Sequence, residues 1–159
     1  PRLKLREAQV ILEKEFNEKC LGAPDLDPKH EKSICEYAKN ELKSEFVFIT
    51  HYPNKKRPFY VYDDPKNKEE TLSFDLLLRV LEVTTGGQRF HLFEDYLNKM
   101  KSRGMNPNDF SDYLSIFKYG MPPHGGLAIG LERLTARLLN LENIREASLF
   151  PRDINRLKP

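Results

Sequence analysis

Apolar and polar positions alternate at helical spacing in the first part of the chain. Between residues 5 and 16 four apolar side chains recur three or four positions apart, with charged residues between them. This pattern predicts an amphipathic helix over residues 4–19. Asp27 followed by Pro28 has the form of an N-cap with proline at the first helical position, and predicts a second helix over residues 28–43.

The pattern then changes to one that is typical of strands. Residues 46–50 and 59–62 are β-branched and aromatic runs, separated by a basic turn with two prolines over residues 51–58. Residues 63–71 are polar without an apolar period, which predicts an exposed loop. A long apolar stretch over residues 72–85 predicts one further strand, ended by two glycines.

The remainder of the chain is mostly helical by the same criteria. Helical periods cover residues 92–103 and 108–117, and a loop rich in proline and glycine follows over residues 119–126. A short apolar strand over residues 127–129 leads into a helix over residues 131–140. Helices therefore precede a group of strands that are joined mostly by loops or hairpins, which predicts an α+β fold with an antiparallel sheet rather than alternating βαβ units.

Composition and charge exclude some classes of protein but do not indicate a function. The 159 residues suffice for one compact domain, and 26 basic against 24 acidic residues leave a net charge of only +2. Bulk charge therefore gives no argument for a nucleic-acid surface, and no membrane helix or signal peptide is expected. Cys20 and Cys35 fit no zinc spacing, which favours reduced thiols in a cytoplasmic protein.

The first candidate site is the turn from the predicted strand at 127–129 into the following helix. Gly130 lets the backbone approach a ligand closely, and a helix N-terminus offers free N–H groups to a phosphate. Arg133 adds a guanidinium that can pair with phosphate oxygens or stack on a flat base. On spacing alone, an ordinary strand–turn–helix corner with a surface pair of Glu132 and Arg133 is the better explanation, because glycine-rich turns are common.

The second candidate is a set of polar residues inside and after the apolar stretch 72–85. In a single regular strand Asp75 and Arg79 share one face, and Glu82 falls on the other. A carboxylate here could hold Mg²⁺ that bridges nucleotide phosphates, with the hydroxyl of Thr85 completing the shell. Arg89 could clamp a substrate carboxylate in a bidentate pair. The alternative is a set of ion pairs on an exposed sheet face.

The third candidate, Arg57, lies on the basic turn before a predicted strand and could reach over a pocket, although a solvated turn is the simpler interpretation. His51, His91 and His124 lack the spacing of metal ligands. The chain contains no nucleophile elbow, no zinc-protease motif and no P-loop.

Together these segments resemble class II aminoacyl-tRNA synthetases, most closely those of the aspartyl type in archaea and eukaryotes. Residues 130–133 match the third class-defining motif, which occupies residues 125–140. Residues 82–91 resemble the family's segment for metal and aspartate, and residues 149–159 resemble the aspartyl C-terminus. The resemblance is clear from residue 46 to residue 159 and implies part of the antiparallel sheet of that class, flanked by helices.

The resemblance also implies ligands and residue roles. ATP and Mg²⁺ would be the cofactors, L-aspartate the substrate, and tRNA a partner that binds mostly through parts outside this chain. Metal binding would fall to Glu82, Thr85 and Asp75, and substrate binding to Thr85, Arg89 and Arg57. The residues that would bind ATP are Glu82, Gly130, Leu131, Glu132 and Arg133, the last also as a catalytic residue.

Several departures from the family pattern limit this expectation. Val80 stands where a glycine is common, as does Ala128 in the third motif. Motifs 1 and 2 and an anticodon-binding barrel are not found, so residues 1–159 are expected to supply about half of a catalytic site. We expect the isolated chain to be inactive and the full-length protein to be a cytoplasmic homodimer. The alternatives are an asparaginyl or asparagine-synthesising relative, and a non-catalytic nucleotide-binding or interaction module of the same fold.

Overall fold

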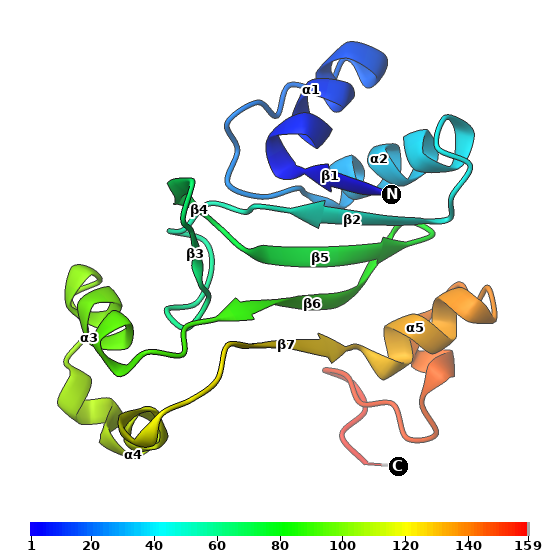
Figure 1. Ribbon diagram of the computed structural model, residues 1–159. Coiled ribbons are helices and arrows are strands. Elements are labelled where there is room, and N and C mark those ends of the chain that lie inside the picture. The colour runs from blue at the N-terminus through cyan, green and yellow to red at the C-terminus, as the bar shows by residue number, and fades with distance from the viewer. Residues whose placement is uncertain (159) are drawn as a thin grey trace. The chain divides into compact units, whose positions relative to one another are not determined.

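The structure, a computed structural model, describes residues 1–158, which form two compact units. The first unit comprises Pro1–Thr50, Asp75–Thr85 and the segment from Ala128 onward. The second comprises His51–Phe74 and Gly86–Leu127. A five-stranded sheet has the order β1-β2-β5-β6-β7, and its last three strands contribute residues to both units. Apart from β1 and β2, which are parallel, neighbouring strands run in opposite directions (Figure 1), so the α+β expectation is confirmed.

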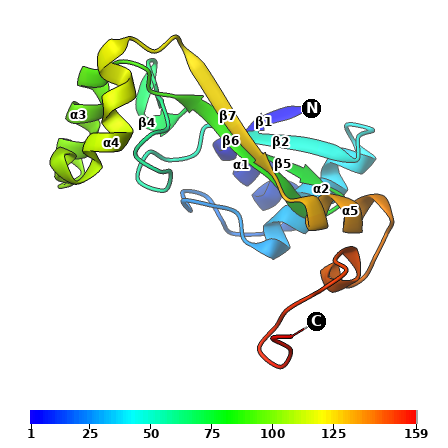
Figure 2. The same cartoon turned by 90° about the horizontal axis from the view of Figure 1, so that it is seen from below.

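In the first unit, two helices pack on the two N-terminal strands. Strand β1 (Arg2–Lys4) pairs in parallel with β2 (Phe46–Thr50), and helices α1 (Leu5–Phe16) and α2 (Pro28–Asn40) contact both each other and these strands. Figure 2 shows both helices on one side of the strands. The apolar stripes predicted from the sequence face this contact, where the core residues include Leu5, Ala8, Leu12, Ile34, Ala38, Val47 and Ile49.

The predicted helix starts agree with the structure because the capping signals are local. Asp27 accepts a hydrogen bond from the backbone N–H of His30 at 2.9 Å, and Pro28 occupies the first helical position of α2. Helix α1 ends earlier than predicted, where Asn17 adopts a left-handed conformation with φ of 55°.

The apolar stretch 72–85 is not one strand, and that prediction is wrong. The chain forms β5 (Ser73–Leu78), turns at Arg79 and Val80, and returns as β6 (Leu81–Arg89). Both turn residues have positive φ, 44° and 70°, which is the backbone of a type I′ hairpin turn. Asp75 and Glu82 therefore lie on neighbouring strands, so their faces cannot be assigned by counting alternate positions along a single strand. The two glycines after residue 85 do not end the strand either, because β6 continues to Arg89.

Val80, which stands where a glycine is common in the family, is the second residue of this turn. A two-residue hairpin of this type favours glycine, because a side chain at positive φ costs roughly 1–2 kcal/mol. Arg79 fixes the turn in place: its guanidinium donates to both carboxylate oxygens of Glu45, at 2.9 and 2.8 Å. It also donates to the carbonyl of Arg137 and the side chain of Asn140, both at 3.0 Å. The hairpin is therefore held by side-chain contacts rather than by a glycine.

We expect Val80→Gly to stabilise the chain by about 1 kcal/mol, or about 2–4 °C in Tm, because it relieves the left-handed strain. Val80 is 39% exposed, so the burial that is lost with its side chain offsets part of the strain relief. Thermal melting measures the effect, with Val80→Ala as the control that keeps a Cβ atom and should gain less. A Val80→Gly protein that melts no higher than the parent would contradict this account.

The second unit contains a small hairpin and a helical cluster. Strands β3 (Asp63–Asp64) and β4 (Asn67–Thr71) pair in antiparallel fashion, so the prediction of an exposed loop over residues 63–71 is wrong. Residues 59–62 do not form the predicted strand; only an isolated bridge joins Val61 to Arg89. Buried Asp64 and Thr71 explain the error, because polar side chains face the interior here.

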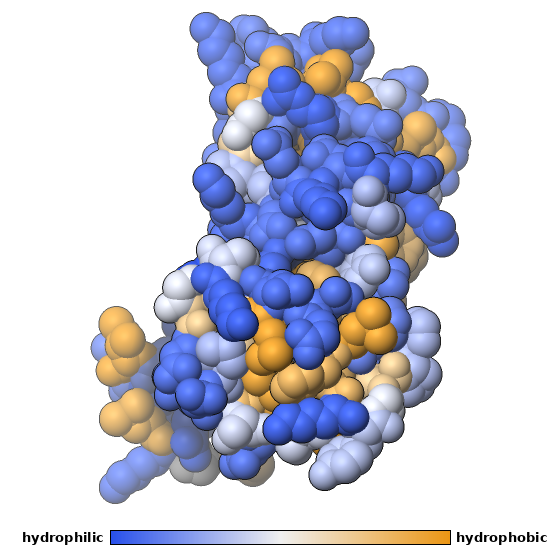
Figure 3. Space-filling view, turned by 60° about the vertical axis from the view of Figure 1, so that its left-hand side comes forward, coloured by the Kyte–Doolittle hydropathy of each residue, from blue (hydrophilic) through white to orange (hydrophobic). Residues whose placement is uncertain are grey.

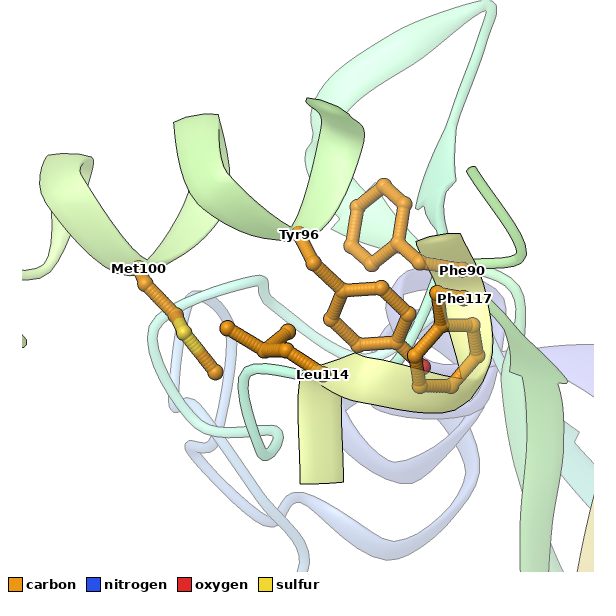
Figure 4. Close-up of a cluster of buried hydrophobic side chains, with 5 residues drawn as sticks. All are labelled: Phe90, Tyr96, Met100, Leu114 and Phe117. Atoms are coloured by element: carbon orange, nitrogen blue, oxygen red, sulfur yellow. The ribbon is translucent and has the colours of Figure 1, made fainter. Parts of the chain in front are cut away.

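The core of the second unit lies between two helical segments. The first is α3 (Phe93–Ser102). The second runs from a 3₁₀ turn, Pro107–Phe110, through α4 (Ser111–Ser115) to another 3₁₀ turn, Ile116–Tyr119. Figure 4 shows the five buried side chains Phe90, Tyr96, Met100, Leu114 and Phe117. The rings of Tyr96 and Phe117 are 4.3 Å apart, and the hydroxyls of Tyr96 and Tyr113 are 3.1 Å apart. This aromatic cluster anchors the segment that carries Phe59 and Tyr60.

Strand β7 (His124–Ile129) leads into α5 (Leu131–Leu138), and a 3₁₀ turn, Ile144–Ala147, follows. Apolar side chains in this C-terminal segment are unusually exposed, among them Ile129, Leu131, Leu138, Leu139, Leu149, Phe150, Ile154 and Leu157. Figure 3 shows hydrophobic side chains at the surface of one face, among hydrophilic ones. Such exposure is typical of surfaces that pack against further protein. No helix within residues 1–158 combines the length and apolarity that crossing a membrane would require.

Candidate active site

The N-terminus of α5 is joined to β6 in the first unit. Gly130 donates its backbone N–H to the carbonyl of Val83 at 2.9 Å, so the helix begins directly beside the strand. A Cβ atom on Gly130 would lie 3.4 Å from Cδ of Arg133 and 3.5 Å from its Cβ and Cγ, because that side chain folds back over the glycine. Leu131 and Glu132 are exposed in the first turn of the helix.

Arg133 and Glu82 meet although 51 positions separate them. The Nη1 atom of Arg133 donates to the carbonyl of Glu82 at 3.0 Å and lies 3.7 Å from its Oε1 atom. The arginine is 46% exposed and the carboxylate 32% exposed, so both can still reach a ligand. The predicted surface pair within one helix turn is therefore replaced by a pair between a strand and a helix.

A concentration of carboxylates surrounds this pair in the first unit. Asp75 is buried on β5, and Glu31 on α2 is partly buried. Burial, followed by repulsion from Glu82, Asp25 and Asp75, raises the pKa of Glu31 to about 7, while Arg133 lowers it. The local field is therefore acidic and would favour a cation or a cationic group.

Glu31 is not among the residues that the sequence singles out, although a signal exists. It lies three positions before Ile34 and seven before Ala38, on the buried stripe of α2. A charge on an apolar stripe must be paired, solvated or neutralised.

The raised pKa of Glu31 predicts a pH dependence of stability. Its folded-state pKa exceeds the unfolded value, so the folded chain binds the proton more tightly and stability falls as pH rises from about 4.5 to 7. We expect Glu31→Gln to remove this loss. Discounted for solvent exposure, the gain at pH 8 is about 1 kcal/mol, or about 2–4 °C in Tm, with little difference at pH 4.

Thermal melting of both proteins at pH 4 and pH 8 measures the difference. The control is Glu36→Gln, an exposed position on the same helix, which should change Tm equally at both pH values. A Glu31→Gln protein whose gain is the same at pH 4 and pH 8 would show that Glu31 does not titrate in this window.

The side chains of the first unit that could bind a metal suit Mg²⁺ better than a metal ion that is held entirely by protein ligands. Within residues 1–158, no group of three or more His, Cys, Asp and Glu side chains is arranged to hold a metal ion. Mg²⁺ usually takes only one or two protein carboxylates and completes its shell with water and substrate phosphates. Glu82 with Asp75 nearby fits that pattern, and exposed Thr85 follows Glu82 by three positions on β6.

Arg89 occupies a defined place in the second unit. Its guanidinium carbon lies 4.9 Å from the centre of the Tyr60 ring. The backbone of β7 at Gly126 is also close, since a Cβ atom there would lie 2.9 Å from both Nε and Nη2 of Arg89. A guanidinium in contact with a ring and a strand is restricted in the directions in which it can present its donors. Gly126 lies in the motif at residues 125–140 and Tyr60 in the segment that follows Arg57, but the proximity of both to Arg89 depends on tertiary packing.

Arg57 is not a solvated cation on a free turn. It is partly buried, and its guanidinium carbon lies 3.7 Å from the centre of the Tyr52 ring. Arg103 on the C-terminal side of α3 donates to the carbonyl of Arg57 at 2.7 Å and to Oδ1 of Asn54 at 3.0 Å. The loop that carries Arg57 is therefore held by α3.

A buried lysine strengthens the same attachment. Nζ of Lys99 lies 2.5 Å from Oδ1 of Asp63, which also accepts from Nδ2 of Asn54 at 2.6 Å. Burial lowers the pKa of Lys99, and the hydrogen bond that Lys99 donates to Asp63 opposes this shift. The ion pair connects α3 to the β3–β4 hairpin, which follows the loop that carries Arg57. That loop is therefore restrained on its C-terminal side as well.

The predicted site residues thus fall into two groups, one in each unit. The first unit brings Glu82, Gly130 and Arg133 together, with Asp75 close enough to influence the same field as Glu82. The second unit contains Arg89 and Arg57, each stacked on a tyrosine ring.

Comparison with known proteins relates the whole chain to one family. The family model for tRNA synthetases class II (D, K and N) matches residues 1–154. An aspartate–tRNA(Asp/Asn) ligase of Thermus thermophilus is 51% identical over 162 residues, covering 100% of this chain and 37% of that protein.

Solved structures of tRNA synthetases also superpose on this chain. An aspartyl tRNA synthetase from Entamoeba histolytica superposes with a TM-score of 0.93 and 34% identity, over 99% of this chain and 32% of its own. An asparaginyl-tRNA synthetase from Pyrococcus horikoshii complexed with asparaginyl-adenylate gives a TM-score of 0.87 and 33% identity, over 100% and 36%. The chain spans about a third of the length of these relatives.

Proposed function

The chain belongs to the class II tRNA synthetases of the D, K and N group, and from that premise we propose that it is part of an aspartate–tRNA ligase. In this proposal the first unit holds ATP and Mg²⁺, and the second unit holds the side-chain carboxylate of L-aspartate. The homologous ligases are named for aspartate in organisms as distant as Thermus thermophilus and Pyrococcus furiosus.

We propose aspartate as the substrate because of the position of Arg89. Its guanidinium lies close to both the Tyr60 ring and the backbone at Gly126, and these contacts restrict the direction of its planar fork of donors. Such a fork matches a carboxylate in a bidentate pair, and a neutral amide gains less from it. This favours aspartate over asparagine, whose adenylate is bound in the Pyrococcus horikoshii complex.

The residues of the first unit are suited to nucleotide binding. Gly130 begins α5 beside β6, and Arg133 points back over the strand to Glu82. Arg133 would contact the nucleotide by pairing with phosphate oxygens or stacking on the base, and the backbone of residues 130–132 would line its path. Glu82 would hold Mg²⁺, with Asp75 supporting its charge and Thr85 supplying a hydroxyl; the ion would neutralise phosphate charge.

The proposed reaction needs alignment more than proton transfer. The α-carboxylate of aspartate attacks the α-phosphorus of ATP, the bond to pyrophosphate breaks, and aspartyl-adenylate forms. The aspartyl group then passes to the terminal ribose of tRNA, releasing AMP. Because the nucleophile is already ionised, no side chain need act as a base, and the residues contribute charge neutralisation and positioning.

Aspartate-dependent exchange between ATP and pyrophosphate, measured on the full-length protein, tests the proposal. We expect exchange with aspartate and little with asparagine, and none from the isolated 159-residue chain. Exchange driven by asparagine would assign the protein to the asparaginyl type. Nucleotide binding without exchange by the full-length protein would instead indicate a non-catalytic module.

We extend the proposal to partners of the full-length protein. The ligases to which this chain is similar are named for tRNA, and this chain has a net charge of only +2. Most of the tRNA contact would therefore lie in other parts of a homodimeric cytoplasmic enzyme. Sedimentation of the full-length protein at several concentrations tests the dimer.

A further inference from the structure

Gly126 lies where any side chain would displace the guanidinium of Arg89. A Cβ atom at this position would be 2.9 Å from Nε and Nη2 and 3.1 Å from Cζ of Arg89. Ordinary contact begins near 3.4 Å, so the guanidinium would have to move by about 0.5 Å. The close approach of this side chain to the strand therefore requires glycine.

The three other glycines of this part of the sheet face different neighbours. A Cβ atom on Gly86 would lie 2.7 Å from Cζ of Phe74 and 2.8 Å from the carbonyl oxygen of Gly126, and one on Gly87 would lie 2.9 Å from the carbonyl oxygen of Leu72. One on Gly125 would lie 3.1 Å from the carbonyl oxygen of Gly87. Each of these glycines is close to neighbouring backbone, whereas the three atoms nearest to a Cβ on Gly126 all belong to the side chain of Arg89.

Tyr60 is the second group in contact with the guanidinium of Arg89. The guanidinium carbon of Arg89 is 4.9 Å from the Tyr60 ring centre, against 3.7 Å for the comparable pair of Arg57 and Tyr52. The contact of Arg89 with its ring is therefore looser than that of Arg57. The Tyr60 ring itself is restrained, because Phe59 packs edge-on against it at 5.6 Å and also packs against the buried cluster of the second unit.

We propose that Gly126 and Tyr60 are positioning residues that fix Arg89 for the side-chain carboxylate of the substrate, and that Gly126 is thereby a determinant of specificity for aspartate. This inference rests on the proposed function, in which Arg89 binds that carboxylate. Binding groups must be held within about 0.5 Å of their productive positions, which is the displacement that a methyl group at position 126 would impose. The fold should tolerate the change, because the atoms that must move belong to a flexible side chain.

The test is Gly126→Ala in the full-length enzyme, with kcat and KM measured for aspartate, asparagine and ATP. We expect KM for aspartate to rise about 10–100-fold, the range for a charge-assisted pair of hydrogen bonds. The KM for ATP should stay within about twofold, and the preference for aspartate over asparagine should fall at least tenfold. Gly125→Ala is the matched control: it should lower Tm and leave the KM for aspartate within about threefold.

A double-mutant cycle with Arg89→Ala separates this inference from the proposed function. If Gly126 acts through Arg89, Gly126→Ala adds nothing in the Arg89→Ala enzyme. Additive effects, or an unchanged KM for aspartate in Gly126→Ala, would overturn the inference while leaving Arg89 as the carboxylate ligand. An Arg89→Ala enzyme with normal aspartate affinity would instead overturn the proposed function.

Tyr60→Leu provides a second, independent route to the same answer if Gly126→Ala fails to fold. It removes the ring contact of Arg89 and should also raise the KM for aspartate without changing the KM for ATP. This effect, too, should vanish in the Arg89→Ala background. A Tyr60→Leu enzyme with the parent's preference for aspartate would overturn the positioning role of Tyr60.

Discussion

Replacing Arg89 by alanine in the full-length enzyme is expected to lower kcat/KM for aspartate by about 10²–10³-fold. The substrate carboxylate would enter its site without a charged partner, and removing one member of a desolvated, hydrogen-bonded charge pair costs roughly 2–5 kcal/mol. Most of the loss should appear as a higher KM for aspartate, because the proposed contact of the guanidinium is with a part of the substrate that does not react. Pyrophosphate exchange at varied aspartate concentrations measures both parameters.

Two further variants make this result specific. Arg89→Lys keeps the charge but loses the planar fork, so it should fall between the parent and Arg89→Ala. Arg145→Ala removes an arginine whose side chain is 56% exposed and pairs with Asp153, and should leave the KM for aspartate unchanged. If aspartate binding survives in Arg89→Ala, the carboxylate lies elsewhere, and Arg57 becomes the first residue to examine.

The second large effect is expected at Arg133. Arg133→Ala should lower kcat/KM for ATP by about 10²–10³-fold, the usual loss when one preorganised electrostatic contact to the reacting group is removed. Its side chain donates to the carbonyl of Glu82 at 3.0 Å, so the variant also frees β6 at the residue proposed to hold Mg²⁺. We therefore expect kcat to fall and the magnesium concentration required for half-maximal exchange to rise.

A neighbouring arginine serves as the control. Arg137 lies one turn further along α5 and donates to the carbonyl of Leu141 at 3.1 Å, which is a structural contact near the helix end. Arg137→Ala should lower Tm and leave the KM for ATP within about twofold. Equal effects of both arginines on ATP kinetics would indicate that α5 is merely destabilised, and would remove Arg133 from the nucleotide site.

The position of helix α2 is predictable from the sequence, but its contribution to the site is not. The apolar period and the Asp27-Pro28 cap locate the helix, because both signals act within a few residues. The significance of Glu31 is not predictable from that period. Its raised pKa depends on burial and on carboxylates that lie 44 and 51 positions further along the chain.

Local spacing and residue type are enough to predict the two N-terminal helices, the strand into Gly130, the motif at residues 130–133 and the resemblance to the family. The turn at Arg79 and Val80 within residues 72–85 is visible only in the folded chain. An apolar run without glycine carries no local mark of a hairpin, and here the turn is held by Glu45, which precedes Arg79 by 34 positions. The contacts of Arg89 with Tyr60 and Gly126 also require tertiary structure, because strand pairing and packing bring together residues that no sequence period connects.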